Sequence, residues 1–185
     1  FAWKVLGRTT RIRDLDASPE KEKALRALLE KNPKDAATLF YLAGIRQVQG
    51  DAAGAAAFLD SLLAVDPEDL EARDFLAALR IAQGRIEEAQ GQYREILKRD
   101  PLNKGALLNL LGILDAGGKT AEADALIEET LRNDPGNSAA LERKAARLKL
   151  DEALVLLEKA RAADPKSPSV AFWLGQAYRL KQDYA

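Results

Sequence analysis

Apolar side chains along most of the chain recur every three or four positions, which is the spacing of one face of an α-helix. Residues 36–65 illustrate this spacing, because one stripe contains Leu39 and Leu42 and the next contains Leu59 and Leu62. No segment combines alternating polarity with the composition typical of a strand. The pattern therefore predicts an all-α protein.

Glycines and prolines divide these stripes into short segments. Glycine offers the backbone freedom needed to end one helix and turn back. An Asp-Pro pair closes the next one, since proline cannot continue a helix and restricts the residue before it. The predicted helices cover residues 20–31, 36–49, 52–65, 70–83, 86–99, 104–116, 120–133, 138–150, 151–163 and 168–181.

The prolines also reveal an internal repeat. Pro33, Pro67, Pro101 and Pro135 follow one another at intervals of 34 residues, and Pro165 comes 30 residues later. The landmarks that keep the same spacing are Gly50, Gly84 and Gly118, then Ala55, Ala89 and Ala123, and then Leu59, Tyr93 and Ile127. Because neither helix of such a unit can bury its apolar stripe alone, neighbouring units are expected to stack.

At these positions the sequence resembles the tetratricopeptide repeat, a helical hairpin of about 34 residues with Leu-Gly, Tyr, Ala, aromatic and Pro landmarks. The fullest match is Leu174-Gly175-Gln176-Ala177-Tyr178, and Leu42-Ala43 and Leu76-Ala77 fill the Leu-Gly places elsewhere. The resemblance covers roughly residues 21–185. It implies a right-handed superhelical solenoid of helix-turn-helix repeats, of the kind found in bacterial scaffold proteins.

The repeat register suggests a domain organisation. Residues 1–18 do not fit the repeat, and residues 19–185 form the repeat domain. The first segment is either a cap, with Phe1, Trp3 and Leu6 covering the first unit, or the juxtamembrane continuation of an upstream membrane helix. The repeat domain divides into a half repeat 19–35, repeats 36–69, 70–103, 104–137 and 138–167, and a partial repeat 168–185. The last unit stops at Ala185, where its second helix should begin.

The fourth unit is four residues shorter than the others, and no Gly or Pro marks its inter-helix turn. The register places the deficit between Leu150 and Asp151. One alternative is a single straight helix from Ala139 to Ala163. The simpler alternative is that turn residues are missing from the sequence between Leu150 and Asp151.

Composition excludes several kinds of chemistry. The chain has no Cys and no His, which rules out disulfides, thiolate nucleophiles and zinc sites built on these residues. Net charge is +3 over residues 1–35, −7 over 36–137 and +3 over 138–185. An acidic middle argues against a nucleic-acid partner, since phosphate binding requires a continuous basic face. No cofactor, metal or small-molecule substrate is predicted.

Two motifs imitate catalytic sites. The stretch from Gly112 to Thr120 nearly spells a P-loop, but its spacing is wrong by one residue and a predicted helix precedes it instead of a strand. Two Glu-Glu pairs, at residues 87–88 and 128–129, lie on predicted helices, where adjacent side chains diverge. No convergent acid–base set remains. The sequence therefore indicates a protein that is not an enzyme.

The resemblance implies that the first helix of each hairpin lines a concave, partner-binding face. Phe40, Tyr41, Phe75 and Leu108 are expected to form an exposed aromatic and aliphatic strip there. Aromatic and Arg side chains are the usual anchors of such interfaces. The predicted groove residues are Phe40, Tyr41, Gln47, Asp74, Phe75, Leu108, Asn109, Arg143, Phe172, Trp173 and Arg179.

The leading functional hypothesis is a scaffold or adaptor that binds a partner polypeptide in this groove. The Ala- and Asp-Pro-rich style suggests a bacterial envelope assembly system such as exopolysaccharide secretion. A cytoplasmic protein is expected, with a tether to the inner membrane upstream of Phe1 as one possibility. The alternatives are a self-assembling module whose incomplete ends form homo-oligomers, and a regulatory domain of a larger enzyme.

Overall fold

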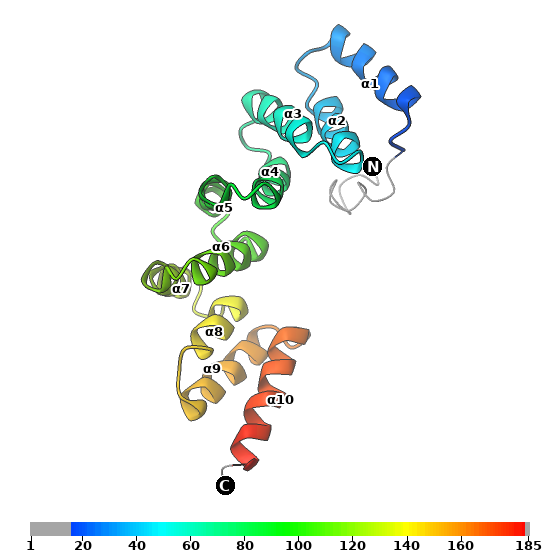
Figure 1. Cartoon of the computed structure of the whole chain (residues 1–185). Coiled ribbons are helices and arrows are strands. Elements are labelled where there is room, and N and C mark those ends of the chain that lie inside the picture. The colour runs from blue at the N-terminus through cyan, green and yellow to red at the C-terminus, as the bar shows by residue number, and fades with distance from the viewer. Residues whose placement is uncertain (1–15, 184–185) are drawn as a thin grey trace. The chain divides into compact units, whose positions relative to one another are not determined.

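The computed structural model describes residues 16–183, and these residues form α-helices joined by short turns, with no strand among them (Figure 1). The predicted all-α fold of tetratricopeptide-like hairpins is confirmed. The first residues, 1–15, for which a capping or juxtamembrane role is predicted, lie outside the described part. The helices are α1 (Pro19–Lys31), α2 (Ala36–Val48), α3 (Ala52–Val65), α4 (Leu70–Ala82), α5 (Ile86–Arg99), α6 (Lys104–Ala116), α7 (Thr120–Asn133), α8 (Ser138–Ala145), α9 (Leu150–Ala163) and α10 (Pro168–Asp183).

The chain divides into two compact units. Residues 1–99 contain α1 to α5, and residues 100–185 contain α6 to α10. In the first unit α2 pairs with α3 and α4 pairs with α5, while in the second α6 pairs with α7 and α8 pairs with α9. Helix α10 packs against α9.

Acidic and amide side chains start five of the ten described helices. The carboxylate of Asp69 accepts a hydrogen bond from the backbone N–H of Ala72 at 2.9 Å, and Asn103 does the same for Ala106 at 3.0 Å. Such a cap satisfies one of the backbone donors that a helix leaves unpaired at its first turn. Asp69 and Asn103 follow Pro67 and Pro101 by two positions, so the same short segment ends one hairpin and begins the next.

Glycine turns join the helices within three of the hairpins. Gly50, Gly84 and Gly118 have φ angles of +79°, +73° and +69°, a region that costs residues with a Cβ atom about 1–2 kcal/mol. In the stretch that imitates a P-loop, Gly118 is this turn residue and helix α6 precedes it. The local structure there is a repeat turn.

The fourth hairpin compensates for its missing residues in an unexpected way. Helix α8 has only eight residues, and a turn over residues 146–149 leads into α9, which begins at Leu150. Arg147 in this turn donates to Asp115 at 2.6 Å, which fixes the turn against α6. The straight helix from Ala139 to Ala163 is therefore wrong, and so is the position of the turn between Leu150 and Asp151. The residues present form the hairpin because the first helix is shorter.

Buried apolar side chains hold each unit together. In the first unit the core includes Leu39, Leu59, Leu62 and Leu76, contributed by α2, α3 and α4. In the second unit a comparable cluster joins α8, α9 and α10 through Leu141, Leu154, Leu157, Val170 and Leu174. Full burial of each such side chain contributes about 1.5–3 kcal/mol, so these clusters are the main stabilising element of each unit.

Arginine pairs reinforce the contacts between successive hairpins of the first unit. Arg46 of α2 donates to Glu22 of α1 at 2.6 Å, and Arg80 of α4 donates to Asp60 of α3 at 3.0 Å. Arg46 and Arg80 are 34 residues apart and therefore occupy the same place in the repeat. The repeat thus reuses one polar link between a first helix and the second helix before it.

Within residues 16–183, no helix is both long enough and apolar enough to cross a membrane. The same residues contain no group of three or more acidic side chains placed to hold a metal ion.

Candidate functional site

The two aromatic residues predicted to lead the exposed strip of the first unit are core residues. Phe40 of α2 is 1% exposed and Phe75 of α4 is 8% exposed. Their ring centroids are 5.8 Å apart, with the rings tilted by 56°. The prediction that they form an exposed strip is therefore wrong. The ring contact joins α2 to α4 within the core of the first unit.

Other predicted groove residues of the first unit do reach the surface. Tyr41 is half-buried against the cluster of Leu25, Leu42 and Ile45, and Gln47 is exposed near the end of α2. Asp74 lies one position before Phe75 on α4 and is half-buried. Beside the buried Phe40–Phe75 pair, these three residues therefore present a phenol, an amide and a carboxylate.

Asp74 stands out electrostatically. Among the residues that the structure describes, it has no hydrogen-bond or ion-pair partner. Partial burial, followed by the nearby negative charge of Glu71, raises the pKa of the Asp74 carboxyl above its ordinary value. Burial disfavours the ionised form of this unpaired carboxylate. A cation bound beside Asp74 would stabilise that ionised form.

In the second unit, polar contacts connect three first helices. Arg143 of α8 lies 3.8 Å from the carboxylate of Asp115 on α6. Ser169 of α10 donates a hydrogen bond to Glu142 of α8 at 2.6 Å. These contacts connect α6 to α8 and α8 to α10 on the side where the predicted residues lie. We refer to this surface as the first-helix face of the second unit.

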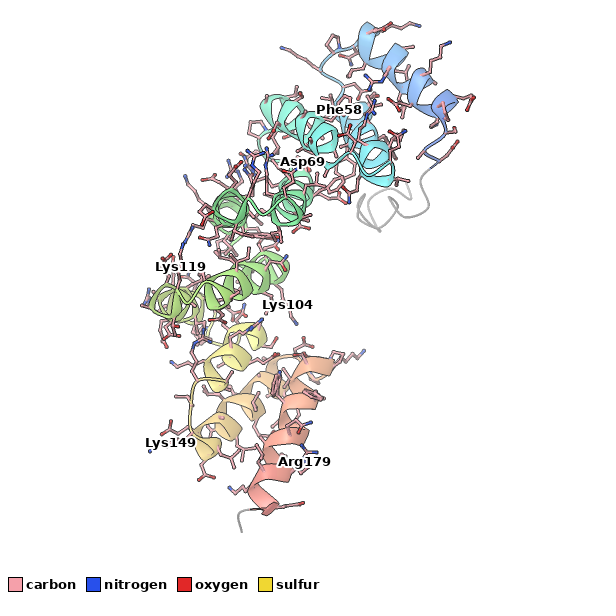
Figure 2. The ribbon with its side chains drawn as sticks, viewed as in Figure 1. Phe58, Asp69, Lys104, Lys119, Lys149 and Arg179 are labelled. Atoms are coloured by element: carbon pink, nitrogen blue, oxygen red, sulfur yellow. The ribbon has the colours of Figure 1, made fainter. Side chains whose placement is uncertain are left out.

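Helix α10 contributes the most exposed aromatic groups of this face. Phe172 is 57% exposed and Trp173 is 48% exposed. Their ring centroids are 5.3 Å apart in an edge-to-face arrangement, which is a favourable geometry for an aromatic pair. Arg179 projects from the same helix toward solvent (Figure 2) and donates to Gln176 at 2.6 Å. The face thus combines an aromatic pair with a cationic side chain.

The remaining predicted residues of the second unit are less prominent. Leu108 on α6 is half-buried, and Asn109 is exposed. Leu108 belongs to a different unit from Phe40 and Phe75, and because those two rings are buried the exposed strip predicted for all three is wrong. Among the predicted groove residues that the structure describes, the aromatic pair on α10 and the carboxylate of Asp74 are the most distinctive.

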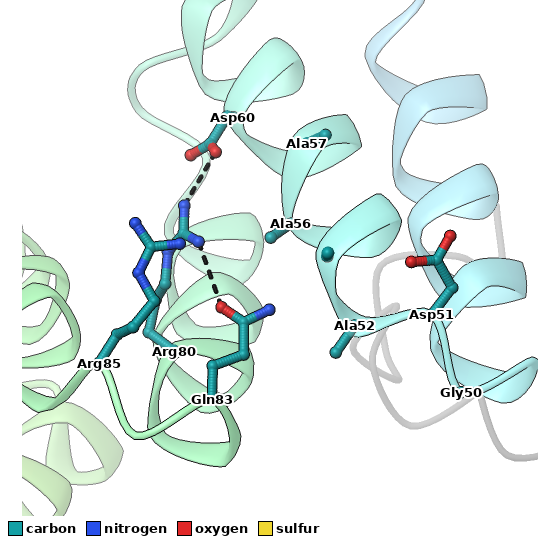
Figure 3. A pocket seen from close by; sticks show the side chains of 10 residues that line it. Gly50, Asp51, Ala52, Ala56, Ala57, Asp60, Arg80, Gln83 and Arg85 are labelled. Atoms are coloured by element: carbon teal, nitrogen blue, oxygen red, sulfur yellow. Dashed lines mark hydrogen bonds and ion pairs between the residues drawn. The ribbon is translucent and has the colours of Figure 1, made fainter.

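One hollow was not predicted from the sequence. It measures about 770 Å³ and lies beside α3 in the first unit, lined by Ala52, Ala56 and Ala57 together with Arg80 and Arg85 (Figure 3). Its two guanidinium groups are already paired, Arg80 with Asp60 and Arg85 with Glu88. The alanines at consecutive turns of α3 are the sequence feature that could have indicated this hollow. The hollow has no uncompensated charge that would mark a ligand site.

The hairpins, their Asp-Pro junctions and the first-helix faces define a helical-repeat protein. The sequence profile of the tetratricopeptide repeat matches three consecutive segments, residues 22–69, 70–138 and 139–185. The chain belongs to the tetratricopeptide repeat family, whose members are generally non-catalytic modules for protein–protein interaction.

Solved structures share this fold at low sequence identity. The MamA protein is 20% identical with a TM-score of 0.59, over 85% of this chain and 92% of its own. YrrB, described as a tetratricopeptide repeat protein with an unusual peptide-binding site, is 19% identical with a TM-score of 0.56, over 87% and 85%. Yeast Tom70 is 19% identical with a TM-score of 0.66, over 93% of this chain and 38% of its own. No curated protein sequence matches the chain.

Proposed function

We propose that this protein is a scaffold that binds partner polypeptides, with Phe172 and Trp173 on the first-helix face of the second unit as the main anchors. The exposure of this aromatic pair is the observation that carries the proposal. Large apolar side chains gathered at a surface rimmed by charge are typical of interaction sites. Aromatic anchors contribute about 2 kcal/mol or more to binding when a partner buries them.

The chemistry of the two faces indicates what the partner should offer. The aromatic pair favours an apolar side chain, presented by a helix or an extended segment. On the first unit, Asp74 favours a Lys or Arg side chain, because a cation would offset the charge that burial disfavours. Each unit thus favours its own kind of partner side chain. That YrrB is described as having a peptide-binding site supports a peptide as the ligand class.

The setting is part of the same proposal. The Ala- and Asp-Pro-rich repeats suggest a bacterial envelope assembly system, such as exopolysaccharide secretion, with the protein in the cytoplasm or tethered to the inner membrane. Cell fractionation of the tagged full-length protein tests this point. A protein found only in the soluble fraction and in no envelope complex would contradict the envelope role.

Selection from a random peptide library displayed on phage tests the binding proposal without a known partner. The bait is the full chain, in parallel with a Phe172→Ala/Trp173→Ala variant and with Leu102→Ala. Leu102 is an exposed apolar residue outside the first helices, so its variant is the matched control.

The proposal predicts peptides that bind the chain and Leu102→Ala equally but bind the double variant at least tenfold more weakly, a loss of about 1.4 kcal/mol. Enrichment of the same peptides on all three baits would refute the anchor role of the aromatic pair. A mass that grows with concentration in light scattering, without any peptide, would favour the self-assembling alternative.

A further inference from the structure

One side of α4 carries a continuous stripe of exposed and half-buried residues. Their spacing along the helix places them within about 100° of its circumference. We call these residues the α4 stripe, and they are Glu71, Asp74, Ala78, Ile81 and Ala82. On the opposite side, Ala72, Leu76 and Leu79 are 2% exposed or less and belong to the core of the first unit. Both α3 and α5 pack against α4 and leave the stripe accessible.

The two halves of the α4 stripe differ chemically. Glu71 and Asp74 make the N-terminal half acidic, whereas the C-terminal half consists of Ala78, Ile81 and Ala82. The two alanines are exposed, and Ile81 is 38% exposed. Because alanine side chains are short, an apolar side chain of a partner can approach the backbone of α4 beside Ile81.

The carboxylate of Asp74 is half-buried but unpaired, unlike two others in the first unit. Glu22 pairs with Arg46 at 2.6 Å, and Asp51 accepts the backbone N–H of Gly54 at 2.8 Å. Phe40 occupies the place of Asp74 in the preceding repeat, so the repeat does not require a carboxylate there. An ionised carboxylate at this depth costs free energy that a bound cation would offset.

We propose that the α4 stripe binds a basic segment of a partner polypeptide, in which a Lys or Arg pairs with Asp74 and a nearby large apolar residue contacts Ala78 and Ile81. Charge complementarity identifies this occupant, because the carboxylates of Asp74 and Glu71 attract a cation and repel an acidic segment. The proposal rests on the proposed function, which already assigns a basic side chain to Asp74. It adds the apolar contact and the spacing of the two residues.

The length of α4 sets that spacing. Asp74 and Ile81 are separated by two helical turns, which is about 10 Å along the helix axis. An extended polypeptide covers this distance in about three residues. The basic and the apolar residue of the partner are therefore expected about three positions apart.

Selection from a displayed library of random peptides tests this site separately from the aromatic pair. The bait is the full chain with Phe172→Ala and Trp173→Ala, which removes the proposed anchors of the second unit. Parallel baits add Asp74→Asn, Asp74→Lys or Ile81→Ser to this chain. Circular dichroism at the helix band verifies that each bait is folded.

Two further baits are matched controls. Glu87→Lys makes the same change of charge as Asp74→Lys, but at an exposed carboxylate of α5. Val65→Ser makes the same kind of change as Ile81→Ser at the end of α3, where the side chain is 39% exposed. Neither residue belongs to the α4 stripe.

The proposal predicts enriched peptides that carry a Lys or Arg and a large apolar residue about three positions apart. In fluorescence anisotropy titrations such a peptide should bind at least tenfold more weakly to the Asp74→Asn and Ile81→Ser baits, and about equally to the two controls. The Asp74→Lys bait should select peptides with Asp or Glu in place of the basic residue. Affinity for the parent bait should fall as salt rises, because an ion pair contributes to it.

Enriched peptides that lack a basic residue, or that bind the Asp74→Lys and Glu87→Lys baits equally, would overturn the proposal. Absence of any enriched peptide would also overturn it. The anchor role of Phe172 and Trp173 is unaffected by either result, because selection on the unaltered chain tests it. A mass that grows with concentration in light scattering, and no longer does so with Asp74→Lys, would overturn the proposal by making a second copy the occupant.

Discussion

The positive φ angle of Gly84 has a measurable consequence when it is compared with a second glycine of the same unit. Gly84 forms the turn between α4 and α5 with φ of +73°, and Gly91 lies within α5 on its exposed side. A Cβ atom added at either position would meet nothing within 4 Å. Any difference between Gly84→Ala and Gly91→Ala therefore reports backbone conformation and not steric contact.

The two substitutions should change stability in opposite directions. A left-handed conformation costs an alanine about 1–2 kcal/mol, while the less flexible unfolded chain returns about 0.4–1 kcal/mol. Gly84→Ala should thus destabilise the first unit by about 1 kcal/mol. Gly91→Ala should stabilise the same unit by about 0.5–1 kcal/mol, since glycine in a helix interior is unfavourable by that amount.

Urea denaturation followed by circular dichroism at the helix band is the appropriate assay. Both positions belong to the first unit, so both changes act on the same unfolding transition even if the two units unfold separately. In thermal melts the variants should differ by about 3–8 °C, on the usual scale of 2–4 °C per kcal/mol for a chain of this size. Equal shifts, or a Gly84→Ala variant as stable as the parent, would refute the assigned turn geometry.

Three further predictions concern single side chains. Asp74→Asn should raise the melting temperature at pH 7, because a carboxyl whose pKa is raised on folding destabilises the folded state when it is ionised. The gain in melting temperature should vanish as the pH falls below the ordinary carboxyl pKa. A gain that persists at that low pH would contradict this cause. Arg80→Met should destabilise the first unit by about 1 kcal/mol, because the ion pair with Asp60 is removed. The destabilisation should be smaller at high salt. A destabilisation that does not depend on salt would indicate packing as the cause instead. Phe40→Ala should destabilise that unit by about 3–5 kcal/mol, whereas Gln47→Ala should leave its urea midpoint unchanged; similar midpoints for both would contradict the core position of Phe40.

Most helix boundaries could be predicted because local chemistry sets them. Each Asp-Pro pair and each turn glycine acts within a few residues of itself, so the 34-residue spacing translates directly into hairpins. The helix boundaries of the fourth hairpin were harder to predict. This unit is four residues shorter than the others, and either helix or the turn could have been the shorter part. The structure shortens α8 and keeps the length of α9, whose side chains pack on both α8 and α10.

The candidate site was less predictable for a physical reason. Phe40 and Phe172 occupy the same place in their repeats, yet one is buried and the other exposed. Phe40 is covered because α4 brings Phe75 against it, and no described helix follows α10 to cover Phe172 in the same way. The register identifies the side of the helix, but burial depends on the neighbouring repeat.

Trp173 offers the most direct test of partner binding by the first-helix face. The chain contains one other tryptophan, Trp3, so Trp3→Phe leaves Trp173 as the sole tryptophan reporter. A peptide obtained by selection on the full chain is then titrated into this variant while the emission spectrum is recorded. We predict a blue shift that saturates together with binding, as the half-exposed indole becomes buried. Saturable binding of the peptide with an unchanged Trp173 emission would contradict the account.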